Sequence, residues 1–258
     1  MKNYSLITGA SSGIGEQFSW VFAENGHDLI LVARGKEKLT ELKKNIQNKH
    51  KVKVEVFDLD LTSMENCKNL YEETKKKSIF VDILVNNAGF GNYGYFHETD
   101  LEKEVNMINL NVTALTTLTK LYLKDMVEKG EGKILNVASV AAFFPGPLMA
   151  VYYATKSYVL GFSEALSEEL ADKGVTVCIL CPGPVKTGFQ DTAQLGNAKF
   201  LKFPTPCARE VAEYGYTSLR DGKVVAVHGT INKIQSELPR FFPRNWVSKV
   251  VKKVSQQE

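Results

Sequence analysis

Tyr152 and Lys156 lie four residues apart in a stretch whose apolar residues recur at helical spacing. At this spacing the two side chains share one helix face, which places a phenol beside an ammonium. A nearby positive charge favours phenolate and lowers a tyrosine pKa from about 10 toward neutral pH. Ser139 ends a short apolar run upstream, where its hydroxyl could bind the same substrate oxygen. These residues predict proton transfer at a substrate oxygen, although Tyr-x-x-x-Lys alone also fits two long side chains on a wet helix face.

A glycine-rich turn near the start of the chain is the second chemical feature. It follows the apolar residues Ser5-Leu6-Ile7, reads Thr8-Gly9-Ala10-Ser11-Ser12-Gly13-Ile14-Gly15, and leads into an amphipathic helix. Such a turn exposes backbone N–H groups at the positive end of a helix, which suits a pyrophosphate. The spacing G-x-x-x-G-x-G differs from the commoner G-x-G-x-x-G, so a tight turn that serves packing alone is the alternative.

Strands and helices must alternate to place these residues at one edge. We expect strands over 5–7, 28–33, 52–57, 81–85, 133–138, 175–180 and 224–227, and the main helices over 36–49, up to 77, 100–128, around 152 and 205–219. This alternation predicts an α/β fold with one doubly wound parallel sheet (a Rossmann fold) and helices on both faces. We expect a single domain over 1–258. Ligands of such sheets bind at the carboxyl ends of the strands, where Gly9, Asp60, Asn86, Ser139 and Pro182 all lie.

Composition narrows the class of protein. The 258 residues are 44% hydrophobic and 24% charged, as in an ordinary soluble globular protein. The chain has no run of about 18 apolar residues and no basic segment before an apolar run at its start, so we expect a cytoplasmic protein without a membrane span. Cys178 and Cys181 are expected in the core, and neither cysteines nor histidines show metal-ligand spacing. We expect no metal and no nucleic-acid partner.

Taken together, these residues resemble the short-chain dehydrogenase/reductase family. The resemblance covers nearly everything from Ser5 to Thr187, and the 13-residue gap between Ser139 and Tyr152 fits. It rests on Thr8 to Gly15, Asn86 to Gly89, Asn111, Ser139, Tyr152, Lys156 and Pro182-Gly183-Pro184-Val185-Lys186-Thr187. It implies an oxidoreductase that transfers hydride between a nicotinamide cofactor and a ketone or aldehyde, or its alcohol.

The resemblance also implies catalytic roles. Tyr152 would protonate the carbonyl oxygen in reduction, and Ser139 would orient that carbonyl. Lys156 would hold the nicotinamide ribose and lower the Tyr152 pKa. Asn111 would kink the long helix and hold a water that links Lys156 to solvent.

Cofactor binding is implied for a second set of residues. The glycine turn would wrap the pyrophosphate and the adenosine side, Asp60 (with Asp58 as the alternative) would meet the adenine, and the segment after Cys181 would bind the nicotinamide carboxamide. The full set is Gly9, Ser11, Ser12, Gly13, Ile14, Gly15, Arg34, Asp60, Asn87, Ala88, Gly89, Tyr152, Lys156, Pro182, Gly183, Val185 and Thr187.

The end of the second strand indicates which nicotinamide cofactor is used. Enzymes that choose NAD usually carry an acid roughly 20 residues beyond the glycine turn, where this chain has Ala33 followed by Arg34. Arg34 can stack on adenine and donate two hydrogen bonds to a 2′-phosphate. We therefore predict NADP(H) in preference to NAD(H). A solvated arginine at a strand end is the alternative.

Three loops are expected to face the site: 90–97, 141–149 and 188–203. They are rich in Phe, Tyr, Leu and Met and contain no arginine, which favours an uncharged, fairly apolar carbonyl, steroid-like or acyl, as substrate. Lys199 and Lys202 could instead meet an anion. We expect a substrate lid over about 187–220. The alternative functions are a cofactor-binding sensor or scaffold without turnover, and sugar-nucleotide epimerase chemistry.

Two surfaces suggest contacts beyond the active site. In the family that the chain resembles, the helix from Asp100 and the helix of Tyr152 form the dimer face, so we expect a homodimer or homotetramer. The apolar residues offered there are Leu115, Leu118, Leu121, Tyr122, Val159 and Leu160. Residues 240–258 predict a basic amphipathic helix with Trp246, Val247, Val250, Val251 and Val254 on one face. Such a helix packs on its own domain or a partner subunit, or lies on an anionic membrane.

Overall fold

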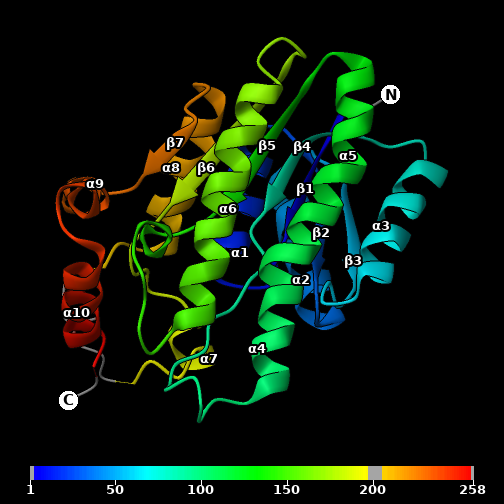
Figure 1. Ribbon diagram of the computed structural model, residues 1–258. Coiled ribbons are helices and arrows are strands. Elements are labelled where there is room, and N and C mark those ends of the chain that lie inside the picture. Colours follow the sequence, from blue (N-terminus) through cyan, green and yellow to red (C-terminus); the bar gives the residue numbers. More distant parts are fainter. Residues whose placement is uncertain (1–2, 197–204, 257–258) are drawn as a thin grey trace.

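A parallel sheet forms the centre of the protein, whose computed structural model describes residues 3–196 and 205–256 (Figure 1). Within these residues the sheet has seven strands in the order β3-β2-β1-β4-β5-β6-β7, and every pairing is parallel. The strands are β1 (Asn3–Thr8), β2 (Asp28–Ala33), β3 (Val54–Asp58), β4 (Phe80–Asn86), β5 (Gly132–Val137), β6 (Val175–Cys181) and β7 (Val225–Val227). The predicted doubly wound α/β fold is confirmed, with strand ends that differ from the predicted ones by no more than two residues.

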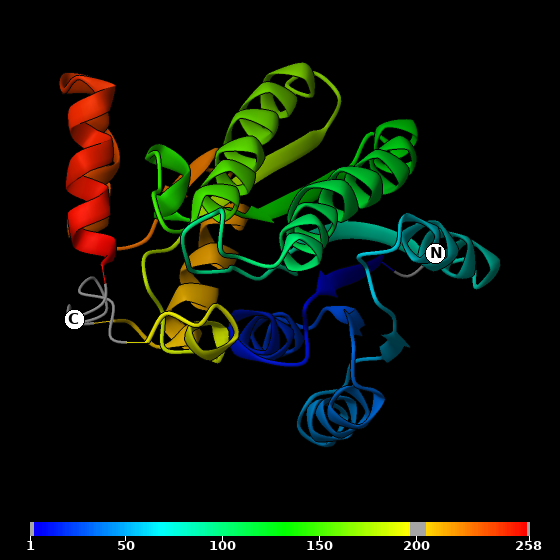
Figure 2. The ribbon, with the colours of Figure 1, turned by 60° about the horizontal axis from the view of Figure 1, so that its bottom comes forward.

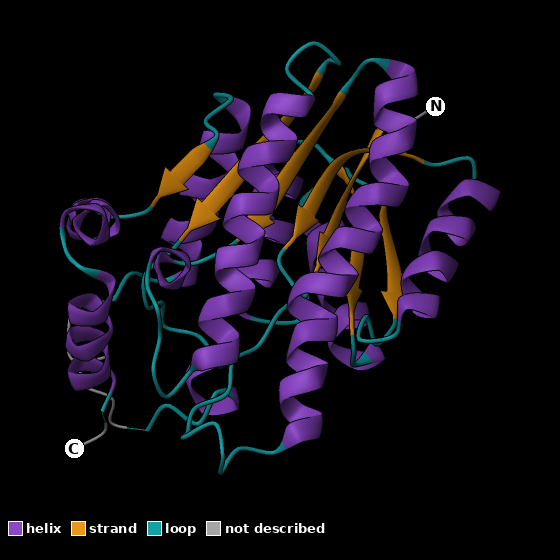
Figure 3. Cartoon of the chain, in the orientation of Figure 1, coloured by secondary structure: helices purple, strands orange, loops and turns teal. Residues whose placement is uncertain are grey.

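Helices cover both faces of the sheet (Figures 2 and 3). They are α1 (Gly13–Glu24), α2 (Lys36–Lys49), α3 (Met64–Lys76), α4 (Leu101–Ile108), α5 (Leu115–Lys129), α6 (Ala150–Glu169), α7 (Phe189–Thr192), α8 (Ala208–Arg220), α9 (Thr230–Glu237) and α10 (Arg244–Ser255). Helices α1, α2 and α8 lie on one face, and α3, α5 and α6 lie on the other. The α9 and α10 helices lie beyond the β7 edge (Figure 1).

The central strands are buried on both faces, which explains their continuous apolar runs. Successive side chains of a strand point to opposite faces, so neighbours in sequence enter different cores. In β1, Ile7 joins the cluster that includes Phe18 and Phe22 of α1. Leu6 joins the cluster that includes Tyr122 and Met126 of α5. This double burial holds the strand ends, and the loops that follow them, in fixed positions.

The predicted helix over 100–128 is not continuous. A π-helical segment, η1 (Asn109–Ala114), separates α4 from α5. A π-turn inserts an extra residue into the helix and frequently marks a functional position. Asn111, where the family resemblance implied a kink, lies within this wide helical turn.

The residues that we expected on a dimer face lie mostly in the core of the chain itself. Leu118, Tyr122 and Val159 are no more than 2% exposed, and Leu115 is also buried, while Leu121 and Leu160 are half-buried. Their contacts with β4, β5 and neighbouring helices account for their apolar character. The exposed apolar residues of this face are others: Leu101, Val105, Ile108 and Tyr158.

Two helix starts also differ from prediction. The helix expected from Thr205 begins at Ala208, where the Cys207 N–H bonds the Glu210 carboxylate. The carboxyl-terminal helix begins at Arg244, after a separate 3-10 turn, η4 (Leu238–Phe241). The α9 helix was not predicted from the sequence.

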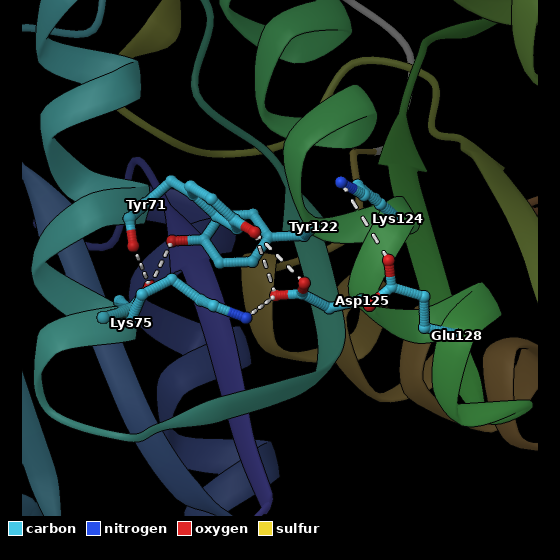
Figure 4. A network of polar contacts seen from close by, with 7 residues as sticks. Tyr71, Lys75, Tyr122, Lys124, Asp125 and Glu128 are labelled. Atoms are coloured by element: carbon cyan, nitrogen blue, oxygen red, sulfur yellow. Dashed lines mark hydrogen bonds and ion pairs between the residues drawn. The ribbon is translucent and has the colours of Figure 1, made fainter.

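Polar contacts tie α3 to α5 on the outer side of one helix layer (Figure 4). The Tyr71 hydroxyl and the Lys75 ammonium both donate to the Asp125 carboxylate, at 3.1 and 2.9 Å. The Tyr122 hydroxyl lies 3.2 Å from the Thr74 hydroxyl, and burial raises its pKa. These side-chain contacts hold α3 and α5 together.

A buried row of polar side chains crosses the sheet and joins it to two helices. The Asn86 amide of β4 donates to Thr119 of α5 and to Asn136 of β5, each at 2.9 Å. Asn136 then donates to Ser163 of α6 at 2.8 Å. Buried amides must find partners because an unpaired one costs free energy. This row therefore fixes α5 and α6 on the strands that lead to Asn87 and Ser139.

Replacing Asn136 by Ala is expected to destabilise the protein by about 2–4 kcal/mol, because Asn86 and Ser163 each lose a partner inside the core. Urea unfolding followed by circular dichroism measures this change. Asn48→Ala, on the exposed side of α2, is the matched control and is expected to change stability by no more than about 0.5 kcal/mol. Equal stability of the two variants would refute the structural role of the row.

Candidate active site

The glycine turn connects β1 to α1 at the carboxyl edge of the sheet. Gly9 and Gly13 both have positive φ, +67° and +57°, which other residues adopt at a cost. A Cβ on Gly9 would lie 2.9 Å from the Ala88 Cα, and a Cβ on Gly15 would meet the Gly9 carbonyl. The Ser12 side chain makes no capping bond to the first turn of α1. The turn therefore presents a close backbone surface and helical N–H groups, which fit the phosphates of a dinucleotide.

Thr8 and Asn87 lock the turn to the end of β4. The Thr8 hydroxyl accepts hydrogen bonds from the backbone N–H groups of Asn87 and Ala88, at 2.9 and 3.0 Å. The Asn87 amide donates to the Thr8 carbonyl at 2.9 Å. Asn87 thus shapes the glycine turn from the neighbouring strand. Ser11 and Ser12 lie at the surface of the turn, and Ile14 packs against the core.

Ser139, Tyr152 and Lys156 come together beyond β5. Tyr152 and Lys156 share the inner face of α6, where they are 9% and 6% exposed, and Ser139, also 9% exposed, lies near enough to Tyr152 for its hydroxyl to act on the Tyr152 pKa. The Lys156 Nζ donates to the Val137 carbonyl at 2.9 Å and lies 5.8 Å from the Tyr152 ring centre. A wet helix surface is excluded for this pair, because both side chains are buried against the strand end.

Burial sets the ionisation of this pair. Burial raises the pKa of Tyr152, and the hydrogen bond with Ser139 acts against that rise. Burial lowers the pKa of Lys156 to about 8. Burial therefore dominates the Tyr152 pKa, and the lowering of that pKa by Lys156 stays a prediction. The phenol carries its proton at neutral pH and can donate it.

Asn111 holds the loop after β4 against α6. Its Nδ2 donates to the Phe90 carbonyl at 2.9 Å and to the Thr155 hydroxyl at 3.1 Å, and its Oδ1 accepts from the Phe90 N–H at 3.1 Å. A Cβ on Gly89 would lie 2.9 Å from Asn111 Oδ1 and 3.7 Å from Lys156 Nζ. Asn111 is thus a positioning residue at the inner end of the site, beside Lys156. Its role as a water ligand stays a prediction.

The segment Pro182 to Thr187 connects the two halves of the site. The Pro182 carbonyl accepts hydrogen bonds from the Val140 N–H at 2.9 Å and from the Ser139 hydroxyl at 3.4 Å. At its other end, the Thr187 methyl lies close enough to Gly13 that a Cβ there would be 3.2 Å away. Val185 is buried between them, and Gly183 packs against Asn232 of α9.

Arg34 and Asp60 lie side by side beyond β2 and β3. Their charged groups are 3.6 Å apart and their side chains are 73% and 44% exposed. Burial would raise the Asp60 pKa, but hydrogen bonds from Thr62 and the Arg34 charge outweigh it and leave that pKa lowered. Asp58 accepts a hydrogen bond from the Gly35 N–H at 2.9 Å, so it shapes the turn after Arg34. Asp58 is exposed and Asp60 is half-buried beside Arg34, and the assignment of Asp60 to the adenine stays a prediction.

An apolar wall covers Tyr152. The Phe189 ring of α7 lies 5.4 Å from the Tyr152 ring, and Gly91 lies so close to Phe189, Met149 and Tyr152 that it has no room for a side chain. Met107, Ala141, Ala193 and Leu195 are buried in the same cluster. All three loops expected to face the site contribute to this wall. Lys199, Lys202 and Phe203 lie outside the described residues.

Sequence reasoning missed several residues that support the site. Thr8 and Thr155 hold Asn87 and Asn111, and Met107 and Asn232 pack behind the substrate and cofactor segments. Only Thr8 carried a usable signal, since it ends a strand directly before the glycine turn. The others come from helices whose relation to the site depends on tertiary packing.

The described part of the chain contains neither a metal centre nor a helix that could span a membrane. Residues 3–196 and 205–256 contain no cluster of His, Cys, Asp or Glu that could hold a metal ion. Cys178 and Cys181 are both buried in β6, and burial raises the pKa of each thiol to about 12. None of the described helices has the length and apolar character needed to cross a bilayer.

Known proteins are similar to this chain in sequence. Residues 3–197 match the family model described as short chain dehydrogenase. The very-long-chain 3-oxoacyl-CoA reductase of Rattus norvegicus is 32% identical over 253 residues, covering 93% of this chain and 77% of that protein. The 17-beta-hydroxysteroid dehydrogenase type 3 of Mus musculus is 34% identical over 219 residues, and the match covers 83% of this chain and 69% of that protein.

A solved structure agrees over nearly the whole chain. The short-chain dehydrogenase from Sphingobium yanoikuyae, in complex with NADPH, is 31% identical with a TM-score of 0.83, and the match covers 93% of this chain and 94% of that one. The bulky-bulky ketone specific alcohol dehydrogenase from Comamonas testosteroni is 28% identical with a TM-score of 0.79, over 93% of this chain and 92% of that one.

Lys156 predicts the pH dependence of turnover. Its ammonium is present below pH 8 and is lost as the pH rises through about 8. We expect kcat/KM for carbonyl reduction to stay level at lower pH and to fall through this range, since that ratio reports groups of the free enzyme. Initial rates from pH 6 to 10 measure it.

Lys156→Arg is the control for this assignment, because a guanidinium keeps its charge over the whole range. The variant is expected to be slower, since its side chain differs in shape, but to lose the fall near pH 8. An unchanged fall in Lys156→Arg would assign it to another group.

Proposed function

Because this chain belongs to the short-chain dehydrogenase/reductase family, whose members act on CH–OH groups, we propose that it interconverts apolar ketones or aldehydes and their alcohols with NADP(H). The observation that carries the proposal is the buried group of Ser139, Tyr152 and Lys156, with a protonated phenol facing an apolar wall. This group combines an acid, an orienting hydroxyl and a cation at one point.

Each residue has a defined task in this proposal. The Tyr152 hydroxyl donates its proton to the carbonyl oxygen in reduction and takes it back in oxidation. Ser139 donates a hydrogen bond that holds the same oxygen, and the buried Lys156 ammonium stabilises negative charge that develops near Tyr152. NADP(H), when bound, supplies or accepts the hydride.

The cofactor would be held along the carboxyl edge of the sheet. Gly9 to Gly15 would bind the pyrophosphate, Asn87 to Gly89 the adenosine ribose, and Lys156 the nicotinamide ribose. The Pro182 to Thr187 segment would bind the carboxamide. The glycine cradle of this chain supports that assignment, because side chains at Gly9 and Gly15 would fill the space beside the turn.

An apolar, uncharged substrate is supported by the wall over Tyr152. Phe90, Met149 and Phe189 surround the phenol, and the loops at 90–97, 141–149 and 188–196 contain no arginine that could bind a carboxylate. The names of the relatives refer to a 3-oxoacyl-CoA, a 17-beta-hydroxysteroid and bulky ketones, of which the acyl-CoA carries charged phosphates away from its acyl chain. Their common feature is a carbonyl next to a large apolar group.

Preference for NADP(H) is supported by Arg34. Its guanidinium is 73% exposed at the end of β2, where a 2′-phosphate would lie, and Ala33 stands where NAD enzymes usually carry an acid. The Asp60 carboxylate lies 3.6 Å from this guanidinium, and a bound 2′-phosphate would compete with it for Arg34. The similar Sphingobium yanoikuyae enzyme was solved with NADPH, which agrees with this choice.

We also propose a homodimer or homotetramer. The face formed by α4 and α6 exposes Leu101 at 73%, Val105 at 45%, Ile108 at 42% and Tyr158 at 40%. A shallow apolar hollow of about 410 Å³ lies between these helices and Phe96. A second copy covering this face would remove that area from water.

Tyr152→Phe tests the chemistry. With NADPH, the unmodified protein is expected to reduce bulky apolar ketones faster than small keto acids, and Tyr152→Phe is expected to lose on the order of 10²–10⁴-fold in kcat while it still binds NADPH. NADPH absorbance measures turnover, and fluorescence titration measures binding.

Tyr153→Phe is the matched control, because Tyr153 is the next residue on α6 and its ring lies 6.1 Å from that of Tyr152. This variant is expected to keep most of the activity. A Tyr152→Phe protein with near-normal kcat would overturn the mechanism, and preference for keto acids would overturn the substrate class.

Arg34→Ala tests the cofactor. The variant is expected to bind NADPH at least about tenfold more weakly, since a charged hydrogen bond is lost, while its affinity for NADH hardly changes. Isothermal titration with both cofactors measures the ratio. Equal or better kcat/KM with NADH in the unmodified protein would contradict the choice of NADP(H).

A further inference from the structure

The α10 helix presents two apolar stripes, of which only one contacts the rest of the protein. Val247 and Ser255 are 7% and 2% exposed and face inward. Trp246, Val250 and Val254 form the other stripe and are 53%, 40% and 40% exposed. Residues four apart share a helix face, so these three form an outward row. The Phe242 ring lies 4.8 Å from the Trp246 ring and extends it; we call Phe242, Trp246, Val250 and Val254 the apolar row.

Basic residues border the apolar row. On a helix of 3.6 residues per turn, Lys249 and Lys253 lie next to the row on the side away from Val247, and both are exposed. From Arg240 to the end, the chain carries five bases (Arg240, Arg244, Lys249, Lys252, Lys253) and one acid, Glu258, which is a net +4. The whole protein carries +3, so its excess charge is concentrated here.

Contacts at its carboxyl end hold α10 in one orientation. The Tyr93 hydroxyl donates to the Ser255 carbonyl at 3.0 Å, and Ser255 also lies near enough to the Tyr153 hydroxyl to lower its pKa against the effect of burial. The Lys252 Nζ lies 5.7 Å from the Tyr95 ring centre. These tyrosines belong to the loop and the helix that surround Tyr152. Figures 1 and 2 show α10 at the outer edge of the protein.

The chemistry of this surface matches an anionic lipid bilayer. Aromatic rings and aliphatic side chains enter the boundary between headgroups and acyl chains, and lysines beside them meet lipid phosphates. A second copy of the chain fits less well. In a symmetric dimer the same patch would face itself and bring two sets of bases together without acids to pair them. The apolar row and the positive charge beside it therefore favour an anionic lipid bilayer over a second copy of the chain.

We propose that α10 docks the protein on anionic membrane surfaces, with the apolar row inserted among the lipids and with Lys249 and Lys253 against the phosphates. Docking in this orientation brings the lipid surface next to the loop of Tyr93 and Tyr95, at the side of the active site. The α10 helix lies in the surface, parallel to it, and does not cross the bilayer.

Vesicle binding of the full chain tests the proposal. The protein contains two tryptophans, so Trp20→Phe leaves Trp246 as the reporter. With vesicles of phosphatidylcholine containing about one third phosphatidylglycerol, we expect a blue shift of Trp246 emission and co-flotation, about tenfold tighter than with phosphatidylcholine alone and weakened by salt. Absence of flotation with the anionic vesicles would overturn the proposal.

Two variants separate the apolar and the charged contributions. Val250→Ser/Val254→Ser is expected to lose flotation, whereas Val127→Ser/Val224→Ser, which changes two comparably exposed valines outside α10 and outside the face of α4 and α6, is expected to retain it. Lys249→Gln/Lys253→Gln changes only exposed side chains and is expected to remove the preference for anionic vesicles. Circular dichroism confirms folding of each variant.

A second copy of the chain is the competing occupant of the apolar row. Light scattering without vesicles distinguishes it, because Val250→Ser/Val254→Ser would then dissociate an oligomer. That dissociation, or equal binding of vesicles by this variant and by the control, would refute membrane docking.

Discussion

The side-chain amide of Asn111 joins three parts of the protein that are far apart in sequence. It pairs with both backbone groups of Phe90, as a neighbouring strand would, and it donates to Thr155 of α6. Asn111 can do this because the π-helical segment turns its side chain inward between α4 and α5. A buried amide with all these partners is costly to displace, so the loop after β4 and the helix of Tyr152 are held together.

The positions of the catalytic side chains follow from this restraint and from the polar row through Asn136. Asn136 joins β5 to α6, and Asn111 joins α6 to the loop above the glycine turn. Tyr152 and Lys156 therefore project from a helix that is fixed at two points. Their burial, in turn, keeps the phenol protonated and brings the Lys156 pKa to about 8, so packing sets the proton chemistry of the site.

The edge of the molecule beyond β7 is organised in a different way. There, α10 contacts the loop of Tyr93 and the ring of Tyr153 through a few side chains and leaves apolar residues in water. Exposed aromatic and aliphatic residues next to bases are tolerated where another surface covers them. The catalytic core is thus held by buried polar contacts, whereas the peripheral α10 helix has an outer face that is available for docking.

The sequence by itself determined the fold class and the identity of the catalytic and cofactor-binding candidates. Apolar runs such as Asp28–Ala33 and the glycines before α1 are local signals, because double burial and positive φ restrict which residues can occupy those positions. Because Gly9, Asp60, Asn86, Ser139 and Pro182 each follow a predicted strand, the sequence alone predicts that they meet at one edge of the sheet.

Only the tertiary structure decided how these residues behave. The π-helical break at Asn111, the raised pKa of Tyr152 and the burial of Leu118 and Tyr122 all depend on neighbours from distant segments. The same is true of α10, where the sequence showed one apolar face and packing divided it into a buried and an exposed stripe. The sequence shows which residues are apolar or ionisable. How much water surrounds each side chain, and which groups it contacts, depends on which segments fold against each other.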